Sequence, residues 1–377
     1  MKQSVVIVQR RMTHYRLPLF NSLRQRLADL DITLRVLHGD PTETEKDKQD
    51  TGELPWAEHL GTRYLLGGNL CLQPFGKQVA GSDLVVVTQE NKLVNNLPPL
   101  LGLGRPARLA FWGHGRNMQT ANPESPLERF KRWTTRRVDW WFGYTQISAD
   151  RVVADGFPIA RVTVLNNSID MASLTAQIAH ARETPRQEMR KEFGLHGDVV
   201  GVFIGSLYPE KLLHRLLRAA QETHRAHPHF QCAVAGAGPM AAVVQAAAAR
   251  SAGVKYLGAV HGERKARLLA ASDLLLNPGL VGLGILDAFA AGIPILTSDC
   301  RLHSPEVAYL EPGRNGLMTM DSDDAFSAAC QALVADAAQR AVLSRGAALS
   351  AETYSLLSMT DRFVAGIETC LAAPPAS

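Results

Sequence analysis

A lysine and several glycines follow predicted strands in the second half of the chain, where they could bind a phosphate. The strand predicted at 199–204 is followed by Gly205 and Ser206 and then by Lys211. Beyond the carboxyl end of a parallel strand, glycine lets the backbone approach a ligand, and the following helix offers unpaired N–H groups to an anion. Lys211 would supply a point charge to a diphosphate at this edge.

A second glycine loop follows the strand predicted at 230–235. It contains Gly236 and Gly238, and Pro239 fits the first position of a helix predicted at 239–252. Taken alone, this loop and the one before it could equally be simple turns.

The segment 277–294 places a glycine-rich loop directly before a predicted helix. Amide groups of Leu283 and Gly284 would face an anion there, and Asp287, about one turn inside, would accept hydrogen bonds from ribose hydroxyls. The alternative for Asp287 is a first-turn carboxylate that stabilises the helix dipole. Two further residues of this loop belong to the predicted ligand site, namely Asn277 and Gly282.

A basic loop follows the first predicted strand, at 4–8. Its polar side chains suit an anionic ligand, whereas the alternative is a helix N-terminal loop that happens to be basic. The residues predicted to bind such a ligand are Arg10, Arg11, His14, Tyr15 and Arg16.

Polar residues also follow two other strands of the first half. Glu90 and Asn91 come after the strand at 84–88, while His114 and Arg116 come after the strand at 108–112. His114 stands between two glycines and is the first choice for an active-site residue, since an imidazole there can contact substrate hydroxyls. The alternative is a structural histidine that caps a turn.

Short β-branched runs alternate with helical patterns along the whole chain, which predicts an α/β fold with parallel sheets. A chain of 377 residues is longer than a single hydrophobic core usually organises. We therefore expect two Rossmann-like doubly wound domains facing across a cleft, at 1–170 and 171–350, and a C-terminal helix at 351–377 that packs back on the first. The polar stretch 40–58 is predicted to be a surface loop, and the tail after 323 to be helical.

Composition is that of a folded enzyme, with 46% hydrophobic and 20% charged residues. The five cysteines lack metal-ligand spacing, and no apolar run is long enough to cross a membrane, so a cytoplasmic location is expected.

The first half of the chain is more basic than the second half. Its basic and aromatic segment 126–141 predicts either peripheral contact with an anionic membrane or a helix with a solvated basic face.

Several motifs resemble the GT-B glycosyltransferases, specifically the retaining family 4. Residues 286–294 resemble the second half of the family's Glu-x7-Glu region, and residues 15–20 resemble an opening found in members that build bacterial surface polysaccharides. Other similar segments occur in family order at 164–170, 205–211, 236–239, 256–258, 305–306 and 313–316. The resemblance implies that the second domain binds a nucleotide-sugar donor, with Gly258 and Val260 near the base, and that the first domain binds the acceptor, with His114 near the donor sugar.

Two departures from the family pattern concern the donor. Gly279 stands where the first Glu is usual and Asp287 replaces the second, while Ser206 stands where an Arg is usual. The loss of the first Glu and the loss of the Arg would each weaken donor binding by about 1.5–3 kcal/mol unless another contact replaces it. An altered donor preference is favoured over a degraded site because Lys211, the glycines and Asp287 remain.

The sequence thus predicts a glycosyltransferase that moves a sugar from a nucleoside diphosphate to a hydroxyl of a glycan or lipid-linked acceptor in bacterial glycoconjugate synthesis. Lys211, Asp287 and His114 are the predicted catalytic residues. No cofactor, metal or nucleic acid is expected. The alternatives are a binding module that has lost turnover and a sugar-nucleotide epimerase of the same fold.

Overall fold

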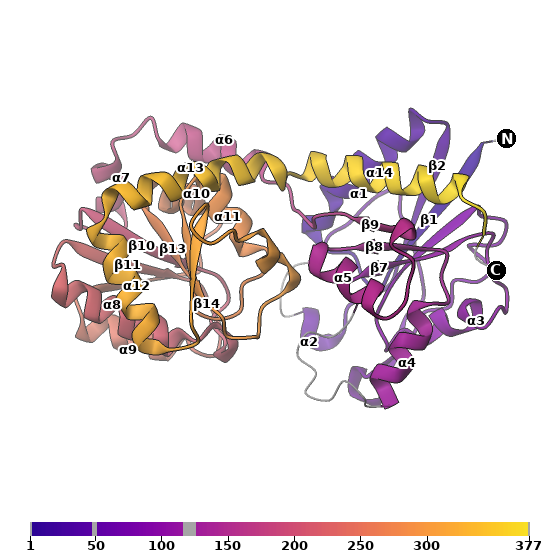
Figure 1. The fold of residues 1–377 in the computed structure, drawn as a ribbon, viewed down its shortest axis with the longest axis horizontal. Helices are drawn as coiled ribbons and strands as arrows, with labels where there is room; N and C mark the ends of the chain where they lie inside the picture. Colours follow the sequence, from indigo (N-terminus) through magenta and orange to yellow (C-terminus); the bar gives the residue numbers. More distant parts are fainter. Residues whose placement is uncertain (1, 47–50, 116–125, 376–377) are drawn as a thin grey trace. The chain divides into compact units, whose positions relative to one another are not determined.

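The protein consists of two compact units, each with its own parallel sheet (Figure 1). The computed structural model describes residues 2–46, 51–115 and 126–375. Unit 1 contains Met1–Ile169 and Leu356–Ser377, and unit 2 contains Asp170–Ser355. The predicted domain limits at 170 and 350 differ slightly, because the last-but-one helix continues to Thr353 before the chain returns to unit 1.

Unit 1 has a seven-stranded sheet in the order β3-β2-β1-β6-β7-β8-β9, with every described neighbour pair parallel. Its strands are β1 (Gln3–Gln9), β2 (Ile32–His38), β3 (Glu58–His59), β6 (Leu84–Thr88), β7 (Leu109–Gly113), β8 (Trp140–Gly143) and β9 (Val162–Val164). A separate antiparallel ribbon consists of β4 (Arg63–Leu65) and β5 (Leu70–Leu72). The strand order reverses direction between β1 and β6, and ligands of such sheets bind beyond the carboxyl ends at that point.

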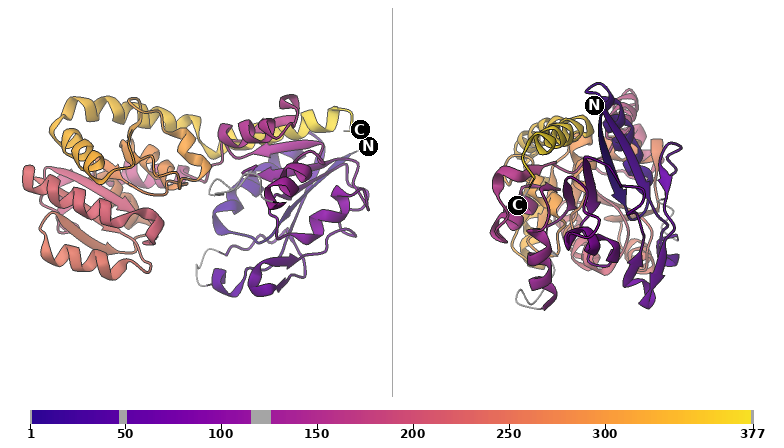
Figure 2. Two further views of the ribbon diagram at one scale, coloured as in Figure 1. Left: turned by 60° about the horizontal axis from the view of Figure 1, so that its bottom comes forward. Right: turned by 90° about the vertical axis from the view of Figure 1, so that its right-hand side faces the viewer.

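Helices cover both faces of this sheet (Figure 2). One face packs against α1 (Leu17–Ala28) and α14 (Leu356–Ala372). The other face packs against residues of α3 (Leu97–Leu100) and α5 (Gln146–Ala154). The remaining helices of unit 1 are α2 (Glu43–Lys46) and α4 (Pro126–Thr135).

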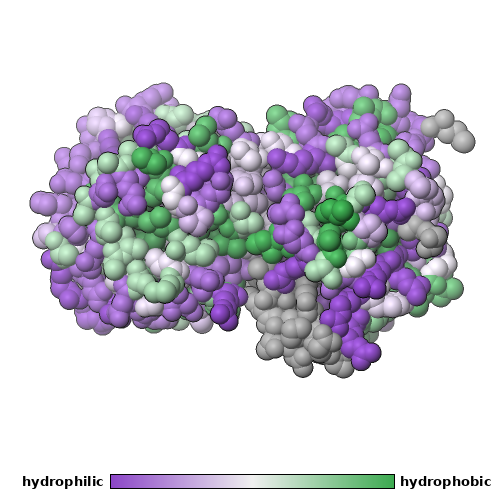
Figure 3. Space-filling view, viewed as in Figure 1, coloured by the Kyte–Doolittle hydropathy of each residue, from purple (hydrophilic) through white to green (hydrophobic). Residues whose placement is uncertain are grey.

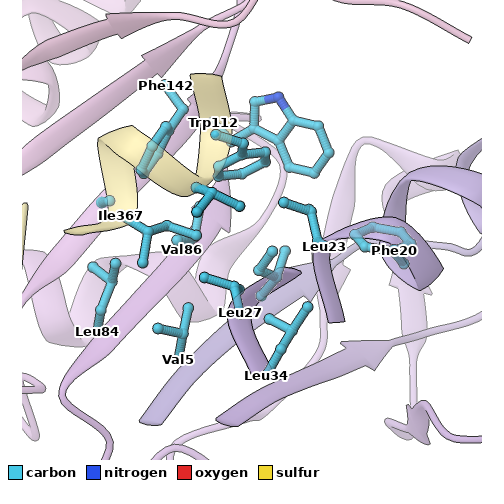
Figure 4. Packing of buried hydrophobic residues seen from close by; sticks show 14 of the residues in the cluster. Val5, Phe20, Leu23, Leu27, Leu34, Leu84, Val86, Trp112, Phe142 and Ile367 are labelled. Carbon is cyan, nitrogen blue, oxygen red and sulfur yellow. The ribbon is translucent and has the colours of Figure 1, made fainter. Parts of the chain in front are cut away.

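The last helix is held on unit 1 by aromatic packing. The Phe363 ring lies 5.1 Å from the Trp112 ring and 4.5 Å from the Phe142 ring, measured between centroids. Figure 4 shows Trp112 and Phe142 in this cluster with Ile367 of α14 beside them. Gly366 faces β9 so closely that a Cβ there would lie 2.5 Å from Thr163 Oγ1. The C-terminal helix is thus part of the unit 1 core.

Unit 2 has a six-stranded parallel sheet in the order β12-β11-β10-β13-β14-β15. Its strands are β10 (Val199–Ile204), β11 (Phe230–Ala235), β12 (Val254–Gly258), β13 (Leu274–Leu276), β14 (Ile295–Ser298) and β15 (Gly316–Thr319). Its helices are α6 (Ala172–Ala181), α7 (Arg186–Glu192), α8 (Leu213–Ala226), α9 (Ala241–Arg250), α10 (Gly262–Ala271), α11 (Gly284–Ala291), α12 (Asp323–Ala335) and α13 (Ala337–Thr353). The strand order reverses between β10 and β13.

The prediction of two Rossmann-like parallel-sheet domains is confirmed. Two local predictions were wrong, those for 40–58 and for Pro239, and one strand of unit 2 was missed. The stretch 40–58 contains α2, whose start is held by hydrogen bonds from the Thr42 N–H and hydroxyl to Glu45 Oε2, and residue 58 already belongs to β3. Strand β15 was not predicted, because its Gly-Leu-Met-Thr sequence is short and only its last residue is β-branched. Pro239 lies two residues before α9 in a turn and does not open that helix.

We predict that Phe363→Ala lowers the free energy of unfolding of unit 1 by about 3–5 kcal/mol, because it removes a buried ring from the core. All five tryptophans lie in unit 1, so tryptophan fluorescence during urea unfolding reports on that unit. Leu357→Ala on the same helix is the control, since Leu357 is 61% exposed. Equal stabilities of the two variants would contradict this packing.

Candidate functional site

Glycine loops at the carboxyl edge of the unit 2 sheet contact one another through their backbones. The Leu207 N–H donates to the Ala237 carbonyl at 2.8 Å, and the Met240 N–H donates to the Leu207 carbonyl at 2.9 Å. A Cβ on Gly236 would lie 1.9 Å from the Gly205 carbonyl oxygen, and one on Gly238 would lie 2.5 Å from that of Leu207. These predicted site glycines are therefore required by the packing of the loops after β10 and β11, whatever ligand the edge binds.

Gly279 makes the same kind of contact between the loops after β10 and β13. The Leu280 N–H donates to the Glu210 carbonyl at 2.8 Å, and a Cβ on Gly279 would lie 2.2 Å from that carbonyl oxygen. No side chain fits there without a shift of the loops. The absence of the expected Glu at this position thus has a steric reason.

Lys211, at the end of the short helix η5 (Pro209–Lys211), lies between these loops. Its ammonium donates to the Leu280 carbonyl at 2.5 Å and lies 5.5 Å from the centre of the Tyr208 ring. In the described part of the chain no carboxylate comes within 4.0 Å of it, and burial lowers its pKa to about 8. A desolvated cation that lacks a carboxylate partner favours an anionic ligand.

The glycine-rich loop ends in helix α11 with free amide groups. The N–H groups of Gly282, Leu283 and Gly284 make no hydrogen bond within the described residues, and all three residues are half-buried. The cap residue Leu283 provides no side-chain bond, and a Cβ on Gly284 would meet nothing within 4 Å. The start of α11 is thus open toward an anion, as predicted for Leu283 and Gly284.

His303, which the sequence did not single out, holds this loop from behind. The Val281 N–H donates to His303 Nδ1 at 3.1 Å, so Nδ1 carries no proton and Nε2 donates to the Ser298 carbonyl at 2.8 Å. Burial lowers the pKa of His303, which keeps the imidazole neutral and able to accept that bond. A histidine five residues after the end of β14 gave no signal of this role in the sequence.

Asp287 has a charged partner that the sequence analysis missed. The carboxylate is buried and lies 2.7 Å from Lys265 Nζ on α10. The ion pair orients Asp287 and neutralises its charge. Periodicity within either helix could not reveal this pairing between two helices.

The other predicted donor residues lie along the same edge. Gly258 has φ of 68° and its carbonyl accepts the Gly236 N–H at 2.8 Å, while Val260 is buried. Ser206 is exposed. Asn277 is buried; its Nδ2 donates to the Leu280 carbonyl at 3.2 Å and its Oδ1 has no hydrogen-bond partner in the described structure. Together with Lys211 and Asp287, these residues surround the carboxyl ends of β10 to β13.

In unit 1, Arg10 is neutralised by acidic residues. Its guanidinium bonds both oxygens of Glu45 at 2.6 and 2.7 Å and Glu90 at 3.1 Å, and Arg11 lies 3.7 Å from Glu45. The pKa of Glu45 is lowered by the hydrogen bonds from Arg10. Arg10 and Arg11 were predicted to bind an anion. The ion pairs with Glu45 and Glu90 compensate most of the positive charge that such binding needs.

His114 and Arg16 come together at the carboxyl ends of β1 and β7. The His114 ring lies 4.3 Å from the Tyr144 ring in an edge arrangement, and the Arg16 guanidinium lies 5.7 Å from that same ring. His114 keeps an exposed surface, yet desolvation of its ring and the nearby Arg16 charge lower its pKa to about 4. The imidazole is therefore neutral at physiological pH.

The remaining predicted acceptor residues are spread along this edge. The rings of His14 and Tyr15 lie 5.8 Å apart, Glu90 is half-buried beside Lys92 at 3.3 Å, and Asn91 is exposed. Arg116 lies outside the described residues.

Comparison with known proteins indicates the class to which this arrangement belongs. Residues 198–336, most of unit 2, match the family model "Glycosyl transferases group 1". Spore coat protein SA of Bacillus subtilis is 26% identical over 189 residues, which are 46% of this chain and 49% of that protein, so the match spans about half of the relative's length. The family-model match over unit 2 supports a glycosyltransferase.

Solved structures resemble the whole chain in fold. Anabaena Alr3699/HepE, solved in complex with UDP, has a TM-score of 0.69 and 15% identity, with 97% of this chain and 99% of that chain covered. The UDP-GlcNAc 2-epimerase of Neisseria meningitidis, solved with UDP-GlcNAc, has a TM-score of 0.61 and 13% identity, with 97% and 99% covered. The two-sheet fold is thus shared by a protein solved with UDP and by an epimerase solved with UDP-GlcNAc.

We predict that Gly279→Ala lowers the free energy of unfolding of unit 2 by about 1–3 kcal/mol, because the added Cβ overlaps the Glu210 carbonyl. Gly284→Ala is the matched control from the same loop and should be tolerated, since its Cβ meets open space. Thermal unfolding followed by circular dichroism measures both. A Gly279→Ala protein as stable as Gly284→Ala would refute the close approach.

Proposed function

We propose that the protein is a glycosyltransferase that uses a uridine diphosphate sugar and transfers the sugar to a hydroxyl of a glycan or lipid-linked acceptor in bacterial glycoconjugate synthesis. The observation that carries this proposal is the ammonium of Lys211, which has no carboxylate partner in the described structure and shares an edge with the open amides of α11. The choice of uridine follows the ligands of the solved structures of HepE with UDP and UDP-glucose.

In the proposed reaction the bond between the anomeric carbon and the diphosphate oxygen breaks while a bond to the acceptor oxygen forms, and the proton of the acceptor hydroxyl passes to the leaving diphosphate. Negative charge grows on the leaving diphosphate, and the role of Lys211 and the α11 amides is to stabilise that charge. Retention of anomeric configuration is part of the proposal on the strength of the family 4 resemblance. No metal is needed for this charge stabilisation.

Asp287 and His114 take separate roles. Asp287, oriented by Lys265, accepts hydrogen bonds from the ribose hydroxyls with its carboxylate. His114 is neutral near pH 7, so it accepts a hydrogen bond from a substrate hydroxyl as the transition state develops. Gly258 and Val260 line the place of the base.

An epimerase is the second candidate, because a UDP-GlcNAc 2-epimerase shares the fold. A non-catalytic binding module is the third, since Ser206 and Gly279 lack the side chains that family 4 members use. Incubation with UDP-GlcNAc alone separates the first two, because an epimerase converts it without an acceptor. A module that has lost turnover would bind UDP and consume no nucleotide sugar with any acceptor.

We predict that Lys211→Ala weakens UDP binding at pH 7 by a factor of about 10 or more, the cost of losing a charged contact to the diphosphate. Isothermal titration calorimetry measures the change, and Lys191→Ala on the surface of α7 is the control. Because the pKa of free Lys211 is about 8, the ammonium is present below pH 8 and is lost above it. UDP affinity should therefore fall about fivefold between pH 8 and 9 in the native protein, as the protonated fraction of Lys211 falls, and stay flat in Lys211→Ala.

Peripheral contact with an anionic membrane belongs to the proposal, with α4 and the turn after α3 as the contact surface. Arginines and Trp133 around the end of α4 line a hollow of about 380 Å³. The neighbouring turn exposes Leu101 and Leu103 by 56% and 66%, and a 2.7 Å hydrogen bond from Arg105 to the Arg137 carbonyl joins it to the residues just after α4. The visible side of α4 is mainly hydrophilic (Figure 3). Arginines beside exposed leucines suit the headgroups and outer acyl region of a bilayer.

No helix of the described residues has the length and apolar character needed to span a bilayer.

We predict that the protein sediments with vesicles containing phosphatidylglycerol and much less with neutral phosphatidylcholine vesicles. Leu103→Ser combined with Arg129→Gln should reduce the bound fraction several-fold, whereas Leu30→Ser, at an exposed position beside α14, should not. Binding that ignores lipid charge, or that survives the double change, would contradict this surface.

A further inference from the structure

Arg16, in the short helix η1 (His14–Arg16) that follows β1, is a buried cation without an acidic partner. Only 7% of the residue is exposed. Its guanidinium lies 5.0 Å from the Trp112 ring and between 5.5 and 5.7 Å from the rings of Tyr15 and Tyr144. No hydrogen bond or ion pair reaches its side chain within the described residues, and Nη1 is buried without a partner.

Such an arrangement costs stability. Buried arginines are normally paired with carboxylates, and the faces of aromatic rings attract a cation without neutralising it. Arg10, on the same edge of the sheet, shows the ordinary solution, because Glu45 and Glu90 both bind it. Two arginines six residues apart thus have opposite environments, one compensated and one not.

The surroundings of Arg16 offer further donors and access. Trp112 Nε1 is also buried without a hydrogen-bond partner in the described structure. His114 follows Trp112 by two residues, keeps an exposed surface, and contacts Tyr144 at 4.3 Å between ring centres. The positive field of Arg16 reaches His114, whose pKa it helps to lower. This corner is therefore electropositive, lined by aromatic rings and open on the His114 side.

We propose that Arg16, with Trp112, His114 and Tyr144 around it, binds an oxyanion carried by the acceptor, either the carboxylate of an acidic sugar or a phosphate. The inference rests on the proposed function, because it assigns unit 1 the acceptor. It narrows that function to acceptors with a negative charge near the reacting hydroxyl, and it selects Arg16 from the cluster of basic residues that the sequence had grouped together. The rings provide faces for a sugar, and the guanidinium provides the charge-assisted hydrogen bonds.

The test compares urea unfolding of unit 1, followed by tryptophan fluorescence, with sodium phosphate, sodium glucuronate or neutral glucose. We expect phosphate or glucuronate to raise the unfolding midpoint of the native protein well beyond glucose. Arg16→Met should lose this response, while its midpoint without anion should equal or exceed the native one, because a buried uncompensated charge has been removed. Since the same salts act on both proteins, general salt effects cancel. Protection by phosphate alone identifies a phosphorylated acceptor, and protection by glucuronate alone identifies an acidic sugar.

Arg10→Met is the matched control. It should lower the midpoint, because Glu45 and Glu90 lose their partner, and it should keep the anion response. Arg16→Lys, which keeps the charge, should retain part of the response.

The inference is overturned if neither anion protects the native protein, if Arg16→Met is protected equally, or if Arg16→Met is destabilised as much as Arg10→Met. UDP binding is measured on the same samples: its absence contradicts the donor proposal, whereas its presence without an anion response contradicts only this inference.

Discussion

The hydrogen bond from the Leu280 N–H to the Glu210 carbonyl brings two loops of unit 2 into backbone contact, and the candidate donor site depends on it. Gly279 must lack a side chain for that contact to form. The contact also fixes the Leu280 carbonyl, which accepts hydrogen bonds from Lys211 and Asn277. The position of the ammonium and the direction of the amides at α11 thus follow from one close approach, which His303 supports from the β14 side.

The same constraint explains the charge of the site. Because Lys211 is held by a carbonyl and not by a carboxylate, its burial is uncompensated and its pKa falls to about 8. Asp287, the acidic residue of α11, forms an ion pair with Lys265. Unit 1 shows a parallel contrast between Arg10, which two carboxylates bind, and Arg16, which aromatic rings surround. In each unit, a buried cation that has no acidic partner among the described residues is one that a charged ligand can stabilise.

The sequence was sufficient for the architecture, because short, mainly apolar runs such as Val199–Ile204 and Phe230–Ala235 became strands at the predicted positions. It also placed Lys211 and Gly284 at strand and helix ends. It could not show that Gly236 and Gly238 serve loop packing, nor that Lys265 pairs with Asp287, since these contacts join residues of separate elements. It grouped Arg10 with Arg16 because local charge is visible in a sequence, whereas the partner of each guanidinium is set by tertiary structure.

A crystal structure of the protein with UDP would test the central claim most directly. The account predicts diphosphate oxygens within hydrogen-bonding distance of Lys211 Nζ and of the N–H groups of Leu283 and Gly284, with the ribose at the carboxylate of Asp287. Nucleotide bound at another part of the molecule, or a diphosphate at this edge that leaves Lys211 bonded only to the Leu280 carbonyl, would contradict it.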